Sequence, residues 1–348
     1  MSTVTIPETA LAAVITTIKE DLQIQKVKVV QPSDLAPGEC LVKVEYAGCC
    51  HSDVHVRDND WGVGKVVAIG ANTTGSPVKI GDRVGMKWCA NACLKCEMCR
   101  TGFEPCCSVA RRDSHGCGVD GTFAEYTRCW VDYVTLIPEG LDSASVTPIL
   151  CAGITVYKGL KRSNAKPGQW IAITGAGGGL GHLAVQYAVA MGLRVIAIDT
   201  GAPKQELCKK LGAEKWVDFL ESKDLVREVQ VAADGLGPHA ALIAVGQEQV
   251  LSQAVMYLRD AGTLVTVGMP GATNGNLNVP VSIIITKCIT IVGSATGNRQ
   301  DMLEALNFVA QGKVACHYEV RDLKEVNDVM KEMTSGNIKG RIVLRIPS

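Results

Sequence analysis

The sequence predicts the α/β class, with a doubly wound parallel sheet and a second, β-rich domain. Two observations lead to this prediction. From about Cys151 onward, short apolar runs alternate with helical patterns, as they do in the βα units of a parallel sheet. Before that point the chain is strand-like and interrupted by turns. A length of 348 residues exceeds one comfortable hydrophobic core and indicates two domains.

Composition excludes several function classes. The chain carries 35 Lys and Arg against 35 Asp and Glu, so it lacks the positive field that nucleic acids or anionic membranes require. It has no basic-then-apolar leader and no uncharged run of transmembrane length, so we expect a cytoplasmic protein. Its 15 cysteines are an odd number, which favours metal ligands or catalytic thiols in a reducing compartment over a disulfide framework.

The individual elements follow in order along the chain. "CLVKVEYAG" alternates apolar and polar residues like a half-buried strand, and "VGKVVAIGANT" and "KIGDRVGMKW" are short β runs interrupted by Gly and Asp. "AALIAVG", "GTLVTVGMP" and "CITIVGSATG" are typical of buried parallel strands. "QELCKKLGAEKW" and "EQVLSQAVMYLRDAG" are helical patterns between them, and the tail from Arg321 reads as a helix followed by a strand.

The glycine-rich stretch "TGAGGGLG" (174–181) lies between the strand "WIAI" and the helical pattern "HLAVQYAVAMG". Glycine lets the backbone approach a pyrophosphate, whose charge then meets a helix N-terminus. The next strand, "RVIAI", ends in Asp199, where an acid accepts hydrogen bonds from ribose hydroxyls and repels a 2′-phosphate. Leu180 falls where the strict glycine spacing from Gly175 requires Gly, yet the order of elements predicts NAD binding. Lys204 can pair with the ribose or with Asp199.

The cysteine-rich stretch "CLKCEMCRTGFEPCC" predicts a structural zinc site. Cys93, Cys96 and Cys99 are spaced by two residues, and the fourth thiolate comes from Cys106 or Cys107. An iron–sulfur cluster usually has its fourth Cys sooner, followed by Pro. A site with four thiolates has no open position, so it holds a loop and performs no chemistry.

Taken together, these motifs resemble the zinc-containing medium-chain alcohol dehydrogenases, specifically the yeast and fungal alcohol dehydrogenase I group. The resemblance covers almost the whole chain and rests on "GCCHSDVH", the cysteine loop, "LCAGITVYKGLK", "GAGGGLGHLAVQYA", "VGMPGA", "IVGSATGNR" and "GRIVLRI". It implies a GroES-like catalytic domain over 1–148 and 292–348 and a Rossmann NAD-binding domain over 149–291. It also implies dimers or tetramers, and it selects Cys107 over Cys106 as the fourth structural ligand. The stretch "VPVSIIITKCITIVG" (279–293) predicts an apolar strand at the far edge of the Rossmann sheet, where it can pair with a second copy of the chain.

The resemblance also assigns site residues. A catalytic zinc would bind the alcohol oxygen and lower its pKa, so that the alkoxide passes hydride to the nicotinamide. Cys50 and Cys151 match the two thiolate ligands, and Asp53 matches the acid that orients the histidine ligand. Ser52 and His55 match the relay that carries the proton to the surface. The dinucleotide contacts map onto His51, Gly178, Gly179, Leu180, Gly181, Asp199, Lys204, Val267, Met269, Ser294, Thr296 and Arg341.

One part of the family pattern is absent from this sequence. In the family, a loop after the residue matching Trp61 ends in Gly-His-Glu, and that His is the third ligand of the catalytic zinc. Here Trp61 is followed directly by "GVGKVVAIG". His115 is the one loosely matching substitute, and we expect it to be an exposed loop residue. The gap lies between two segments that both match the family, which favours loss of the Gly-His-Glu segment at an exon boundary or in the gene model. A transcript that runs directly from the Trp61 codon to the Gly62 codon would contradict this hypothesis.

The leading functional hypothesis is a zinc- and NAD-dependent alcohol dehydrogenase that interconverts small primary alcohols and aldehydes, or an aldehyde reductase of a specialised fungal pathway. Trp61, Trp88 and Met269 are expected to narrow its alcohol pocket. The alternative is an NAD-binding pseudoenzyme, or the product of an incomplete gene model, that lacks the third catalytic ligand. A zinc-independent reductase of the quinone reductase type is disfavoured, because it has no use for Cys50 and Cys151.

Overall fold

The computed structural model describes residues 5–17, 20–50, 61–269, 275–335, 338 and 340–347. The described residues form two compact units. The first comprises Met1–Cys151, Gly297–Leu306 and Cys316–Ser348, and the second comprises Ala152–Thr296 and Asn307–Ala315. Within the described part of the chain, no helix combines the length and the apolar character needed to cross a membrane.

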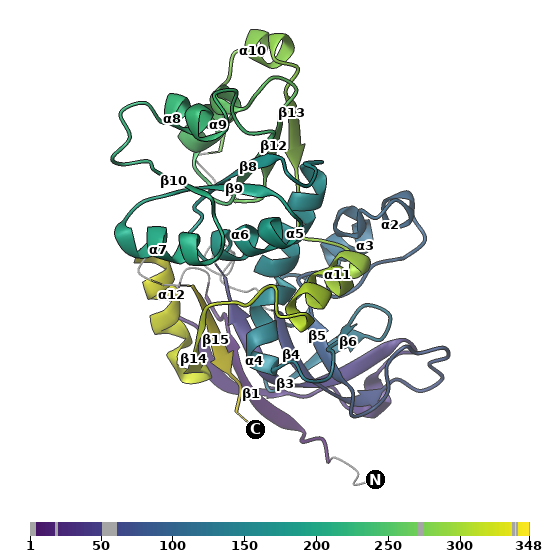
Figure 1. Ribbon diagram of the computed structural model, residues 1–348. Helices are drawn as coiled ribbons and strands as arrows, with labels where there is room; N and C mark the ends of the chain where they lie inside the picture. Colours follow the sequence, from purple (N-terminus) through teal and green to yellow (C-terminus); the bar gives the residue numbers. More distant parts are fainter. Residues whose placement is uncertain are drawn as a thin grey trace. The chain divides into compact units, whose positions relative to one another are not determined.

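The second unit is built on a six-stranded, wholly parallel sheet (Figure 1). Its strands are β8 (Trp170–Thr174), β9 (Arg194–Asp199), β10 (Lys215–Asp218), β11 (Ala240–Ile243), β12 (Thr263–Thr266) and β13 (Thr290–Gly293). They lie in the order β10-β9-β8-β11-β12-β13, which is the Rossmann order. This order confirms the predicted doubly wound sheet.

Helices cover both faces of this sheet. They are α5 (Ala152–Arg162), α6 (Gly181–Ala190), α7 (Ala202–Lys210), α8 (Leu225–Ala232), α9 (Glu248–Tyr257) and α10 (Val281–Thr286). Figure 1 shows α8 and α9 together on one face, and α5 and α6 on the other. Val229, Ala254 and Val255 of α8 and α9 meet Ile196, Ala241 and other strand side chains in one buried cluster. Apolar runs in the strands are thus explained by burial on both faces.

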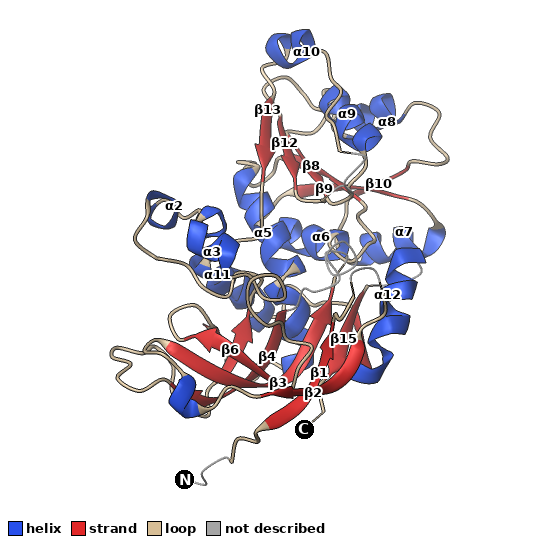
Figure 2. Ribbon diagram, turned by 180° about the vertical axis from the view of Figure 1, so that it is seen from behind, coloured by secondary structure: helices blue, strands red, loops and turns tan. Residues whose placement is uncertain are grey.

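The first unit is built on a seven-stranded sheet, in which six strands follow the order β14-β15-β3-β4-β5-β7 and β6 pairs with β3 (Figure 2). The strands are β3 (Glu39–Cys49), β4 (Trp61–Ile69), β5 (Arg83–Met86), β6 (Tyr126–Trp130), β7 (Thr135–Leu136), β14 (Tyr318–Asp322) and β15 (Arg341–Arg345); β1 (Thr9–Val14) and β2 (Gln23–Lys28) form a separate antiparallel pair. This β-rich architecture confirms the predicted second domain.

Helices accompany these strands. The α-helices are α2 (Glu97–Arg100), α3 (Ser108–Arg112), α4 (Ser143–Val146), α11 (Arg299–Ala310) and α12 (Val326–Ser335), and the 3₁₀ helices are η1 (Pro32–Asp34), η2 (Glu104–Cys106), η3 (Thr147–Leu150) and η4 (Leu323–Glu325). One of them, α11, begins in this unit and continues into the second unit from Asn307. The predicted C-terminal helix followed by a strand corresponds to α12 and β15. Side chains of α12, such as Val326 and Val329, pack against the sheet in the main core of this unit.

Two local predictions are wrong. β3 is buried along most of its length rather than on alternate residues, because Val42 faces the main core while Leu41 faces a second apolar cluster. The apolar stretch "VPVSIIITKCITIVG" is a strand only over Thr290–Gly293. Its middle forms the helix α10, which follows Pro280 and buries Ile283 and Ile284 partly against the core.

Candidate functional site

The glycine-rich turn between β8 and α6 has the backbone geometry that the sequence predicts. Gly175 has φ +66°, in the left-handed region that favours glycine. A Cβ atom at position 181 would lie 2.0 Å from the carbonyl oxygen of Gly175. Gly181 therefore serves the close approach of helix and strand, although the residue at the strict motif position is Leu180. The first N–H groups of α6 lie at the carboxyl end of the sheet, where parallel sheets bind nucleotides.

Asp199 organises this turn. The carboxylate is buried, with 4% of the residue exposed, and lies at the end of β9. One oxygen accepts from the N–H of Gly177 at 2.9 Å. The other accepts from the N–H of Thr200 at 2.9 Å and from Nζ of Lys204 at 2.8 Å. Asp199 thus lies directly beside the glycine turn, and Lys204 neutralises its charge.

The other residues assigned to the dinucleotide in this unit lie at the carboxyl ends of neighbouring strands. Val267 follows β12, and Met269 is 74% exposed. Ser294 follows β13; its Oγ is buried and has no hydrogen-bond partner within the described residues. Thr296 has φ +40°, which is unusual for a β-branched residue. A buried hydroxyl without a partner at this edge fits a ligand that supplies one.

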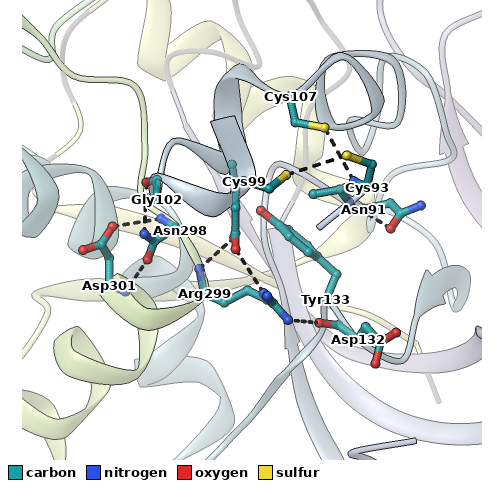
Figure 3. A network of polar contacts seen from close by, with 12 residues as sticks. Asn91, Cys93, Cys99, Gly102, Cys107, Asp132, Tyr133, Asn298, Arg299 and Asp301 are labelled. Carbon is teal, nitrogen blue, oxygen red and sulfur yellow. Dashed lines mark hydrogen bonds and ion pairs between the residues drawn. The ribbon is translucent and has the colours of Figure 1, made fainter. Parts of the chain in front are cut away.

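A cluster of four thiols lies in the cysteine-rich loop of the first unit (Figure 3). The sulfur atoms of Cys93, Cys96, Cys99 and Cys107 all lie within 4.8 Å of one another. Cys96 and Cys99 are 3.6 Å apart, and Cys93 and Cys99 are 4.0 Å apart. Two thiolates that share a tetrahedral zinc ion are separated by about 3.8 Å, given Zn–S bonds of about 2.3 Å. The donor set fits zinc, and Cys107 rather than Cys106 completes it.

Backbone N–H groups stabilise the thiolate forms of Cys93 and Cys107. Burial alone raises the pKa of the Cys107 thiol, but N–H groups of Cys93, Ala110 and Val109 outweigh burial and lower that pKa to about 6. N–H groups of Lys95 and Cys96 likewise lower the pKa of Cys93. Metal binding requires thiolates, so this arrangement favours the metal-bound form.

The cysteine loop is anchored to the start of α11 by a polar network (Figure 3). The carboxylate of Glu104 accepts from Nε of Arg299 at 3.1 Å and from its backbone N–H at 3.0 Å. The carbonyl of Gly102 accepts from Nδ2 of Asn298 at 3.0 Å. Nη1 of Arg299 donates to the carbonyl of Asp132. Glu104 is buried, and its carboxylate lies at the N-terminus of α11. Its negative charge is therefore stabilised by the Arg299 guanidinium and by the positive end of the helix dipole.

The two cysteines assigned to the catalytic zinc also lie together. Cys50 directly follows β3, Cys151 follows η3, and their sulfur atoms are 3.8 Å apart. Nη2 of the buried Arg341 lies 3.7 Å from the sulfur of Cys151. Burial lowers the pKa of the Arg341 guanidinium, but the neighbouring sulfur atoms of Cys50 and Cys151 outweigh burial and hold that pKa above its usual value. Arg341, assigned to the dinucleotide from the sequence, is thus the cation beside this thiol pair.

No third metal ligand joins this pair within the described ranges. There, the only group of three or more metal-ligating side chains is the cluster of Cys93. The predicted residues His51, Ser52, Asp53 and His55 lie outside the described residues. Within the part of the chain that the structure describes, this pair supplies two of the three protein ligands that a catalytic zinc takes.

His115 is not the exposed loop residue that the sequence suggested. It is 1% exposed, and its Nδ1 lies 3.0 Å from the carbonyl oxygen of Asp120. Burial is the main cause that lowers its pKa from 6.5 to about 4. The polar segment around it misled the prediction, because the turn folds back so that His115 bridges to Val119.

This burial predicts acid sensitivity. Above pH 6.5, His115 is neutral in the folded and in the unfolded chain, so it does not make the free energy of unfolding depend on pH. Between pH 6.5 and about 4, only the unfolded chain binds the proton, so stability falls by about 3 kcal/mol as the pH is lowered. Urea unfolding at several pH values, compared with a His115→Gln chain, measures the difference. Parallel pH profiles for the two chains would contradict the assignment.

Of the two tryptophans assigned to the alcohol pocket, the structure describes the side chain of Trp88 but not that of Trp61. Trp88 is half-buried and packs against the apolar cluster of the cysteine loop, which includes Tyr133 and Ala110. Trp61 begins β4, and its side chain lies outside the described part of the structure.

Comparison with known proteins decides the family. The model of the alcohol dehydrogenase GroES-like domain matches residues 36–139, and that of the zinc-binding dehydrogenases matches residues 179–311. The chain is 43% identical over 325 residues to alcohol dehydrogenase 1 of Emericella nidulans, covering 89% of this chain and 91% of that one. It is 42% identical to alcohol dehydrogenase 1 of Neurospora crassa, covering 97% and 98%. The chain belongs to the zinc-containing medium-chain alcohol dehydrogenases.

Solved structures of two other proteins have the same fold. The alcohol dehydrogenase of Aeropyrum pernix superposes with a TM-score of 0.84 at 28% identity, covering 96% of this chain and 99% of that one. Acetophenone reductase from Geotrichum candidum, solved in complex with NAD, superposes with a TM-score of 0.83 at 26% identity, covering 98% of both chains.

Sequence reasoning missed two features of this zinc-containing medium-chain dehydrogenase. The first is the contact of Arg341 with Cys151, which joins residues 190 positions apart. The second is the network of Glu104 with Arg299. Glu104 in "GFEPCC" could have indicated this network, because a carboxylate beside four thiolates requires a neighbouring cation.

Proposed function

We propose that this chain is an NAD-dependent alcohol dehydrogenase that interconverts small primary alcohols and aldehydes. The observation that carries the proposal is the buried Asp199 carboxylate, which lies at a glycine turn on the carboxyl edge of a Rossmann sheet. It is supported by relatives named alcohol dehydrogenase at 41–43% identity.

In this reading, the second unit binds and orients the cofactor. NAD, when bound, accepts hydride from the alcohol carbon. The N–H groups at the start of α6 would face the pyrophosphate, with Gly181 keeping the turn close enough. Asp199 would accept from the ribose hydroxyls and repel a 2′-phosphate, which selects NAD over NADP. Ser294 would supply its buried hydroxyl near the nicotinamide end.

In the first unit, Cys93, Cys96, Cys99 and Cys107 would hold a structural zinc ion. That ion would cross-link the loop 93–107, and Glu104 would connect the loop to α11. We assign no reaction step to this zinc, because four thiolates leave no position open to substrate.

A second candidate function is NAD binding without alcohol turnover. The observation that favours it is in the sequence, where Trp61 is followed directly by "GVGKVVAIG" and the Gly-His-Glu segment of the family is absent.

One experiment separates the two candidates. The full chain is purified, its zinc per chain is measured by elemental analysis, and NAD reduction by ethanol is followed at 340 nm. About two zinc ions with turnover support the dehydrogenase. About one zinc ion, NAD binding by calorimetry and no turnover support the second candidate. A chain that fails to bind NAD contradicts both.

We also propose that the chain forms a dimer through β13. This strand is the edge of the six-stranded sheet, and Ile291 on it is 40% exposed. Val281 and Ile285 of the adjacent α10 are exposed as well. An exposed apolar edge strand favours pairing with a second copy; a tetramer would need a further contact.

We expect Ile291→Lys to shift the protein from dimer to monomer, because a buried lysine would interrupt the apolar edge. Leu236→Lys is the matched control, because Leu236 is an exposed apolar residue of the same unit. Light scattering after size exclusion measures both masses. A native chain that is monomeric, or two variants with equal masses, would contradict the interface.

We further infer a cytoplasmic protein whose partners are small alcohols and aldehydes rather than nucleic acids or membranes. Support comes from the balanced charge and from the cysteines. All fifteen lie in described segments and none is in a disulfide, which favours a reducing compartment.

A further inference from the structure

A second acid lies beside Asp199 at the carboxyl edge of the parallel sheet. Asp218 ends β10 as Asp199 ends β9, and the two residues are register partners in these neighbouring parallel strands. Because neighbouring strands lie about 4.8 Å apart, the two acids occupy adjacent positions on this edge. The N–H of Phe219 also donates to the carbonyl of Asp199 at 3.2 Å, which joins the two strand ends.

The Asp218 carboxylate holds the turn that follows β9. Its Oδ2 accepts from the N–H of Gly201 at 3.0 Å, and its Oδ1 accepts from the N–H of Leu220 at 3.0 Å. Burial raises the pKa of the Asp218 carboxyl, but these N–H groups and the Thr200 hydroxyl outweigh burial and lower that pKa. Asp218 is therefore ionised at neutral pH, and it connects the turn after β9 to the loop after β10.

The turn after β9 contains donors that could bind a 2′-phosphate on the adenosine ribose, but carboxylates already occupy them. A phosphate binds to N–H groups or to cations. The N–H of Thr200 and Nζ of Lys204 both donate to Oδ1 of Asp199, at 2.9 Å and 2.8 Å. The N–H of Gly201 donates instead to Asp218. An added 2′-phosphate would therefore have to displace two carboxylates rather than one.

The surroundings of Asp218 are also negatively charged. An open hollow of about 310 Å³ borders this residue and Ala202, which directly follows Gly201. Within the described residues, the lining of the hollow includes Glu221 and Glu228 as well as Asp218, but no lysine or arginine. A phosphate group carries up to about two negative charges near neutral pH, so like-charge repulsion would weaken its binding beside this hollow.

We propose that Asp218 is a second specificity-determining residue for the dinucleotide, which excludes NADP by holding the Gly201 N–H and by adding its charge beside Asp199. The inference rests on the proposed function, because it deepens the selection of NAD that is assigned to Asp199. Asp218 acts through the turn and not on the reacting atoms, so it is a positioning residue. Removal of the Asp199 charge alone therefore leaves the Gly201 donor occupied and the chain still selective for NAD.

The test measures the binding of NAD and NADP to the full chain by calorimetry, with NADP titrated in competition against NAD. The measured quantity is the ratio of NADP affinity to NAD affinity. We expect Asp199→Asn and Asp218→Asn each to raise this ratio by about tenfold, and the double variant to raise it by about a hundredfold. In Asp218→Asn the amide oxygen can still accept from Leu220, whereas the amide nitrogen cannot accept from Gly201.

Glu221→Gln is the matched control. It removes one charge from the same hollow and leaves the Gly201 N–H bound to Asp218. Because Glu221 is exposed and its charge is screened by salt, we expect the ratio to change by less than about threefold. An equal rise in Glu221→Gln and Asp218→Asn would overturn the role of the Gly201 contact. If circular dichroism shows that Asp218→Asn does not fold, Asp218→Ser is measured in its place.

The outcomes separate this inference from the proposed function. An unchanged ratio in Asp218→Asn, or an equal loss of both affinities, would show that Asp218 only shapes the loop after β10. That result would overturn the inference and leave NAD binding intact. A native chain that binds neither nucleotide would overturn the NAD site and the inference with it. Alcohol turnover does not enter the ratio, so its absence would overturn the proposed dehydrogenase alone.

Discussion

Cys107→Ser is expected to remove one zinc ion per chain and to destabilise the first unit by more than about 4 kcal/mol. Cys107 is buried, and its sulfur lies within 4.8 Å of three other thiols. A serine oxygen is a poor zinc ligand, and the three remaining thiolates would repel one another without the metal. The anchoring contacts of Glu104 with Arg299 would then hold a loop that no longer has a fixed shape.

Cys106→Ser is the matched control, since Cys106 is adjacent in sequence but lies outside the cluster. We expect it to keep its zinc and to change stability by less than about 1 kcal/mol. Elemental analysis gives the zinc content. Tryptic cleavage after the exposed Lys95 and Arg100 reports loop opening, and it should accelerate at least about tenfold in Cys107→Ser alone. Equal zinc content in both variants would show that the cluster is not the metal site.

The cysteine cluster could be predicted from the sequence because its ligands are local. Cys93, Cys96 and Cys99 occupy a stretch of seven residues, and such spacing can close a tetrahedral site in few conformations. The short-range spacing of the cysteines does not decide between Cys106 and Cys107. It depends on the 3₁₀ turn η2, after which the Cys107 side chain faces the other sulfur atoms.

The Rossmann sheet was predictable for a different reason. Its strands are buried on both faces, so each is a continuous apolar run bounded by glycine or an acid. The stretch 279–293 was wrongly predicted to be one strand, because apolar content alone does not separate a short helix from a strand. Pro280 marks the helix start, since proline is tolerated just before the first turn.

The contacts among Cys50, Cys151 and Arg341 could not be predicted from the sequence. Arg341 meets Cys151 only because β15 pairs antiparallel with β3, which brings Ile342 opposite Cys49. This pairing joins the C-terminal tail to the segment that ends at Cys50. No spacing rule connects residues so far apart, whereas the absent Gly-His-Glu segment could be recognised only by resemblance to a family.

Gly181→Ala is expected to weaken NAD binding by at least about tenfold, which corresponds to about 1.4 kcal/mol. The added methyl group would lie 2.0 Å from the carbonyl oxygen of Gly175 and 2.6 Å from Cα of Ala176, both backbone atoms that cannot rotate away. The turn must therefore move relative to α6. That movement would also disturb the hydrogen bond from Gly177 to Asp199, which lies in the same turn.

Gly178→Ala provides a graded comparison within the same turn. Its added methyl group would meet only the Gly175 oxygen, at 3.2 Å, which a shift of a few tenths of an ångström relieves. We expect it to weaken NAD binding by less than Gly181→Ala does, although both change one glycine to alanine. Calorimetric titration with NAD measures both affinities, and circular dichroism confirms the fold. If the two variants lose equal affinity, the effect comes from glycine flexibility in general rather than from the close approach at position 181. If neither loses affinity, the dinucleotide does not use this turn.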